Sequence, residues 1–210
     1  AQILLLIPML AVVLNHFQTM KGSNHLVAVS PSLRFSFFAA IGYVITCVMA
    51  AALSSMSLSR FTFLSYTGDA LQMCGYYMFF TMAMFGAIYF IVPRITGCEW
   101  VSGKRIRYHF WLSTYGIVFM CIMLLLAGLF NGAAIDSWGR DFQSAVIFSS
   151  GCLIGRILTW VFLLTGNLIF LHHLALMVLN RGRRAGTATL IYPSSAPATL
   201  PNTTTEAVKA

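Results

Sequence analysis

Acidic residues are scarce in this 210-residue chain, which holds five Asp and Glu against thirteen Lys and Arg, and charged residues make up only 9% of it. Ordinary soluble domains contain about 25% charged residues. So few charges cannot cover a folded surface in water, which excludes a soluble enzyme, a disordered chain and a coiled coil. With 59% hydrophobic residues, the composition is instead that of a protein whose solvent is the lipid bilayer.

Cysteine motifs and intramembrane acids are missing as well. The five cysteines, Cys47, Cys74, Cys98, Cys121 and Cys152, contain no CxxC pair, so neither a disulfide framework nor a zinc site is indicated. No acidic residue falls in the middle of an apolar segment, which argues against a proton relay through this chain. The basic residues are not gathered in one dense stripe, and nucleic-acid binding is therefore not expected.

Five apolar segments predict five transmembrane helices, because each is close to the ~20 residues that a helix needs to cross the hydrocarbon. They lie at about residues 1–18, 34–56, 69–93, 108–130 and 152–179, and Pro8 is expected to kink the first. Inside a bilayer each backbone N–H must find a partner within its own helix. The predicted fold is all-α: an integral membrane helical bundle over 1–181, followed by an extended, Pro-, Thr- and Ala-rich tail over 182–210.

Basic residues between the segments predict the orientation. Two fall in the first gap, four in the third gap and four in the tail, while the other two gaps hold few. The positive-inside rule makes the richer side cytoplasmic, so the C-terminus is expected inside and the first helix enters from outside. From this outside N-terminus we expect that residue 1 is not the beginning of the whole functional unit.

Small and polar residues indicate where helices meet. Gly128 and Gly132 form one GxxxG motif, and Gly151 and Gly155 form another. Such spacing lets helix backbones approach closely in lipid, so we expect the fourth and fifth helices to cross there. Asn167 lies in the middle of the last segment and is expected to hydrogen-bond to a neighbouring helix.

The histidines do not form a recognisable metal site. The adjacent His172 and His173 point about 100° apart on a helix and cannot simply share one metal ion. His16 and His109 are able to approach one another, although no spacing requires it. The residues alone thus predict a subunit of a larger assembly without an active site of its own.

A family resemblance is carried by the stretches Ile7–Asn15, Thr19–Gly22, Pro31–Phe35, Phe85–Arg94, His109–Gly116, Ala127–Gly128 and Leu164–Ile169. Over about residues 1–183 the chain resembles the last five helices, the C-terminal half, of the catalytic subunit I of cbb3-type haem–copper cytochrome c oxidases. The resemblance implies a multi-pass protein of a bacterial-type inner membrane. It also implies that the partners are other integral membrane subunits of a respiratory complex, some of them haem-bearing.

The chain departs from this family at the haem ligands. The tenth helix of the family carries a Gly-His-Val-His motif, whose two histidines bind the two haems. Counted without gaps, these positions are Leu71 and Met73, and with a three-residue insertion they are Gly68 and Ala70. Neither alignment places a histidine at these positions. The copper ligands of the family lie on earlier helices, which this chain does not contain. The resemblance therefore implies a degenerate half, with haem b and copper held only by partner chains. The aromatic run Tyr76–Phe80 is expected to fill the space of a lost cofactor.

The sequence as a whole predicts a non-catalytic, structural or assembly subunit of a cbb3-like respiratory oxidase or a related electron-transfer complex. Two alternatives stay open: a split piece of a catalytic cytochrome c oxidase subunit I, and a small transporter-like membrane protein. The lack of a buried charge in the apolar segments argues against the transporter.

Overall fold

The computed structural model describes residues 2–63, 65–136, 139, 141–179 and 183–184. Its elements are the 3₁₀ turn η1 (Gln2–Leu5), α1 (Leu6–Met20), α2 (His25–Val29), α3 (Pro31–Leu53), α4 (Met56–Thr62), α5 (Thr67–Met73), the π-helix η2 (Cys74–Thr81), α6 (Met82–Thr96), β1 (Cys98–Glu99), α7 (Gly103–Asp136), α8 (Phe142–Val178) and β2 (Arg183–Arg184). Within these residues, five helical stretches are long and apolar enough to cross a membrane. They are Ile3–Met20, Pro31–Leu53, Thr67–Thr96, Gly103–Asp136 and Phe142–Val178. The prediction of an all-α bundle with five spans is confirmed.

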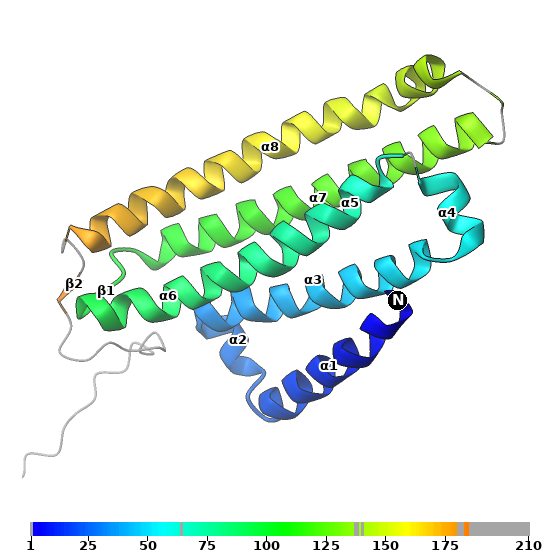
Figure 1. The fold of residues 1–210 in the computed structure, drawn as a ribbon. Coiled ribbons are helices and arrows are strands. Elements are labelled where there is room, and N and C mark those ends of the chain that lie inside the picture. The colour runs from blue at the N-terminus through cyan, green and yellow to red at the C-terminus, as the bar shows by residue number, and fades with distance from the viewer. Residues whose placement is uncertain (1, 64, 137–138, 140, 180–182, 185–210) are drawn as a thin grey trace, which may run out of the picture.

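Four long rods lie side by side in the bundle (Figure 1): α3, the continuous α5–η2–α6 helix, α7 and α8. The helix α8 packs chiefly on α7, while α3 packs on η2 and α6. The shorter α1 lies obliquely against α3 (Figure 1). Since few residues of α1 and α8 are buried within the described chain, most of their apolar surface faces outward, as expected of helices surrounded by lipid or by other subunits.

Local signals set the ends of these helices. The Ser30 side chain accepts a hydrogen bond from the N–H of Leu33, with Pro31 in the first position of α3. Pro8 stands in the first turn of α1, directly after the 3₁₀ turn, where its missing N–H breaks no helical bond. The helix type changes from 3₁₀ to α at Leu6, and the kink at Pro8 stays a prediction. Pro93 does not mark the end of a segment, because α6 continues to Thr96.

Two buried clusters form the core. The sulfur-rich cluster lies between α5–η2, α7 and α8 and consists of Ala70, Cys74, Met78, Ile117, Met120, Cys121, Leu124 and Leu163. The aromatic cluster lies between α3, α6 and the start of α7 and consists of Phe35, Ala39, Met82, Phe85, Tyr89, Ile106 and Phe110. The two clusters occupy different levels of the same bundle. One level is packed mainly by sulfur-containing and aliphatic side chains, and the other mainly by aromatic rings.

A short antiparallel strand pair closes one end of the bundle. Cys98 of β1 pairs with Arg184 of β2, and Glu99 pairs with Arg183. The extended tail predicted for 182–210 otherwise lies outside the described residues, and its boundary at residue 181 stays a prediction. This pairing attaches the chain that follows α8 to the connection between α6 and α7.

Candidate functional site

The imidazole of His109 is fully enclosed within the aromatic cluster. Its Nδ1 atom lies 2.9 Å from the hydroxyl group of Tyr89, which joins α7 to α6. The ring stacks on Phe170 of α8, with centroids 5.1 Å apart, and it also contacts Phe35 and Phe85. His109 of α7 therefore contacts three other helices, α3, α6 and α8, at one level of the bundle.

A second histidine, His173 of α8, holds the connection between α6 and α7. The N–H of Ser102 donates a hydrogen bond to its Nε2 atom over 3.3 Å. Trp100 packs on the His173 ring with centroids 4.9 Å apart, and its Nε1–H donates to the carbonyl oxygen of Tyr89. The two histidines thus belong to one network of rings and hydrogen bonds at the end of the bundle that contains β1.

This network has the features of a packing site. Within the described residues, no group of three or more His, Cys, Asp or Glu side chains is placed to hold a metal ion. The Nε2 atom of His109 is buried and has no hydrogen-bond partner among these residues, while the ring packs against the aromatic side chains of Phe35, Phe85 and Phe170. His16 contacts Phe37 instead, so the structure gives His16 and His109 different partners.

The four family positions lie on α5 at the level of the sulfur-rich cluster. Ala70 is completely buried in that cluster, Met73 packs against it, Leu71 is half-buried and Gly68 is exposed. Next to them, the Sγ atom of Cys74 lies 3.1 Å from that of Cys121 on α7. The space between α5 and α7 is filled by these small and sulfur-containing side chains.

The helices α5 and α7 approach each other closely at Thr67. A Cβ atom added to Gly128 of α7 would collide with both the side chain and the backbone of Thr67. The backbones of the two helices are therefore close together at this level.

The aromatic run Tyr76–Phe80 does not fill one cavity as a unit, which corrects the expectation from the sequence. Tyr76 and Phe80 are 70% and 58% exposed, whereas the Tyr77 hydroxyl donates a hydrogen bond to Oδ1 of Asn167 over 3.3 Å. The run forms the π-helix η2, in which the Thr81 hydroxyl reaches back five residues to the carbonyl oxygen of Tyr76. This wider turn directs Tyr77 toward α8.

The glycine motifs approach other partners than those expected. Gly128 and Gly132 face the start of α5 and the residue Phe61 of α4, and not α8. Gly155 of α8 does face α7, where an added Cβ would lie 2.8 Å from Sδ of Met123, but Gly151 faces open space. The helices α7 and α8 still pack on each other, and Gly116 and Gly166 lie close to the opposite helix as Gly155 does.

Sequence reasoning missed the pair Cys74–Cys121 and the π-helix. The two cysteines are 47 residues apart, a spacing that matches no known motif. The small residues Gly42 and Gly75 around η2 are the available signal, since a Cβ at Gly42 would lie 2.7 Å from the carbonyl oxygen of Met78. Such a contact becomes visible only after α3 and η2 have been placed together.

Sequence comparisons identify known proteins that are similar to this chain. The sequence model of the family "Cytochrome C and Quinol oxidase polypeptide I" matches residues 1–151. A "Cytochrome c oxidase subunit 1 homolog" of Agrobacterium tumefaciens (strain T37) is 30% identical over 124 residues, which is 56% of this chain and 23% of the relative. The "Cytochrome c oxidase subunit 1" of Rhodobacter capsulatus is 29% identical over 117 residues, 52% of this chain and 22% of the relative. A homolog from Azorhizobium caulinodans is 27% identical over 131 residues, 62% of this chain and 24% of the relative. Each match thus spans less than a quarter of the relative.

Proposed function

The chain belongs to the family of cytochrome c and quinol oxidase polypeptide I, and from this premise we propose that it is a membrane subunit of a cbb3-like respiratory oxidase or a related electron-transfer complex. Its role is structural or assembly-related, and the redox chemistry takes place on partner chains. Haem b and copper are held by those partners. The partners are integral membrane subunits, and the lipid bilayer surrounds the rest of the chain.

The packing of α5 on α7 is the observation that carries this proposal. Ala70 and Cys74 occupy the space between these helices, and Thr67 touches the α7 backbone at Gly128. A helix that presented a haem at this level would need an axial ligand for the iron, and the family's histidines are absent from the positions of Gly68, Ala70, Leu71 and Met73. The chain instead offers a closed, apolar contact that stabilises the bundle itself.

The outward surface supports an assembly role. Apolar side chains of α1 such as Ile7 and Phe17 are 66% and 67% exposed within the described chain. Helices with so little internal burial are stabilised by neighbours in the membrane. In the proposed orientation the end with β1 and the starts of α3 and α7 is cytoplasmic, and the membrane is a bacterial-type inner membrane.

The test is co-purification combined with haem spectroscopy. The full chain is expressed with an affinity tag in its native host cells and purified in mild detergent. Haem b and the co-purified polypeptides are then quantified. We expect haem-bearing partners at equal stoichiometry, and no haem on the chain after these partners have been dissociated. A stoichiometric haem b signal retained by the isolated chain would contradict the proposal and favour a piece of a catalytic subunit I. A homo-oligomer without redox partners would favour the transporter.

The variant His109→Phe provides a matched control for this experiment. Because the His109 ring is enclosed by aromatic side chains, it is expected to bind no iron. The haem content of the purified complex should therefore be unchanged in the variant. A loss of one haem per complex would show that His109 is a ligand after all.

A further inference from the structure

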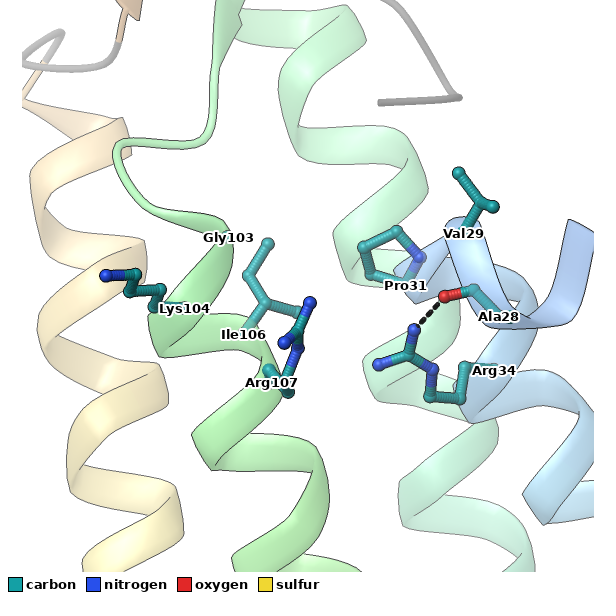
Figure 2. Close-up of a pocket in the computed structure, with 8 residues that line it drawn as sticks. All are labelled: Ala28, Val29, Pro31, Arg34, Gly103, Lys104, Ile106 and Arg107. Carbon is teal, nitrogen blue, oxygen red and sulfur yellow. Dashed lines mark hydrogen bonds between the residues drawn. The ribbon is translucent and has the colours of Figure 1, made fainter. Parts of the chain in front are cut away.

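A cavity of about 500 Å³ lies between the starts of α3 and α7 (Figure 2), within the range of about 300–1,000 Å³ that small-molecule sites occupy. It is lined by Ala28, Val29, Pro31, Arg34, Gly103, Lys104, Ile106 and Arg107. Three of these eight side chains are basic and none is acidic. The cavity is therefore strongly positive, in a chain where acidic residues are scarce.

Arg34 is held in place by the backbone of the preceding turn. Its Nε–H donates to the carbonyl oxygen of Val27 over 3.4 Å, and Nη2 donates to that of Ala28, the bond drawn in Figure 2. A guanidinium group has five N–H donors in a planar fork. Two are used by these carbonyls, so three remain for a ligand at the cavity.

Arg107 of α7 lies on the opposite side of the cavity from Arg34 of α3 (Figure 2). The two positive charges act on one another, and no carboxylate of the lining residues stands between them. Like charges placed together in a half-buried site cost free energy unless an anion compensates them. Lys104 also lines the cavity, but its side chain points away from the two arginines, toward α8, in Figure 2.

We propose that this cavity binds the phosphate group of an anionic phospholipid. Arginine forks match phosphate oxygens in charge and in geometry. The first residues of two helices, Pro31 of α3 and Gly103 of α7, also line the cavity, and helix N-termini add partial positive charge. The shared chemistry, a phosphate, is available from a lipid headgroup or from free phosphate in solution.

The surface next to the cavity favours the lipid. Trp111 and Tyr115 follow Arg107 at intervals of four residues, so all three share one face of α7. Trp111 and Tyr115 are 43% and 63% exposed, and their rings stack with centroids 5.1 Å apart. Exposed aromatic side chains of this kind lie at the level of lipid headgroups in membrane proteins. An acyl chain along this face would continue directly from a phosphate held by Arg107.

The experiment is a lipid titration of the purified full chain, followed by native mass spectrometry. Phosphatidylglycerol and phosphatidylcholine with identical acyl chains are added, and bound lipid is counted. The wild-type chain should prefer phosphatidylglycerol, and Arg107→Gln should weaken this binding by about tenfold, the effect of one lost charge-assisted hydrogen bond. Arg94→Gln is the matched control, because Arg94 is an exposed arginine that lies outside the cavity lining. It should leave lipid binding unchanged.

Two further arms complete the test. Arg34→Lys keeps the positive charge and should bind more lipid than Arg34→Gln. Because Arg107 is exposed, Arg107→Gln is expected to fold, and it tests the site even where Arg34→Gln fails to fold. Inorganic phosphate alone is added as competitor and should not displace the lipid. Equal binding of the two lipids, equal behaviour of Arg107→Gln and Arg94→Gln, or full displacement by inorganic phosphate would each overturn the proposal.

Discussion

The hydroxyl group of Tyr89 lies 2.9 Å from Nδ1 of His109, and both side chains are almost completely shielded from solvent. This bond joins α6 to α7 inside the aromatic cluster, at the level where Trp100 and His173 hold the connection between the same two helices. A hydrogen bond in such an apolar environment is electrostatically stronger than in water, so it helps to fix how the two helices face one another.

Removing one partner of this bond should destabilise the bundle. In Tyr89→Phe the Nδ1 atom of His109 stays buried without its partner, and such a group costs about 1–3 kcal/mol. Replacing both partners with phenylalanine removes both polar groups, so Tyr89→Phe/His109→Phe should lose less stability than the sum of the single variants. Thermal unfolding in detergent measures all three. Strictly additive effects would show that the two side chains do not interact.

Substitution at Gly128 should disturb the contact between α5 and α7. The added Cβ of Gly128→Ala meets the backbone of Thr67, which cannot move aside like a flexible side chain, and overpacking of this kind costs about 1–3 kcal/mol. Gly151→Ala is the matched control, since nothing lies within 4 Å of its Cβ position and alanine favours the helix. The midpoint of thermal unfolding should fall for Gly128→Ala only. Equal midpoints would contradict the close approach.

The five spans were predictable because bilayer thickness sets the length of an apolar helix. Their ends were less predictable. The helix α7 (Gly103–Asp136) extends past both ends of the expected 108–130, and α8 (Phe142–Val178) begins well before the expected 152 and ends near the expected 179. Backbone hydrogen bonding continues past the hydrocarbon until a cap such as Asp141 ends it. The length of an apolar segment in the sequence therefore predicts only the part of the helix that lies in lipid.

The partners of single residues were not predictable from spacing. A glycine stripe identifies a face that a backbone can approach, but Gly128 meets α5 while Gly155 meets α7, and nothing in the motifs distinguishes these partners. Asn167 was identified as a polar residue in need of a partner, and Tyr77 became that partner only through the π-turn of η2. Such contacts depend on how each helix is rotated about its own axis, and this rotation is determined by tertiary packing.

The start of α8 should respond to acid. The Ser144 hydroxyl donates to the carboxylate of Asp141 over 2.6 Å, and the Ser144 N–H also donates to it. These bonds hold the pKa of Asp141 below its usual value. A lowered folded-state pKa contributes stability above the unfolded value of about 3.9, which is lost as the pH falls through the folded value. Amide exchange in the first turn of α8 should accelerate in that range in the wild type, but not in Asp141→Asn. Identical profiles would rule out this cap.

The pair Cys74–Cys121 should be selectively cross-linked by a mild oxidant. Their Sγ atoms lie 3.1 Å apart in the sulfur-rich cluster, and both thiols are free and buried. A membrane-permeant azo oxidant such as diamide accepts two electrons and two protons from the two thiols, which then form one disulfide. After proteolysis, mass spectrometry should find a peptide pair joined through Cys74 and Cys121, two hydrogens lighter than the separate peptides and absent from Cys121→Ser. Because η2 and α7 carry the two cysteines, a cross-link from Cys74 to Cys152 of α8 in place of Cys121 would contradict the packing of η2 on α7.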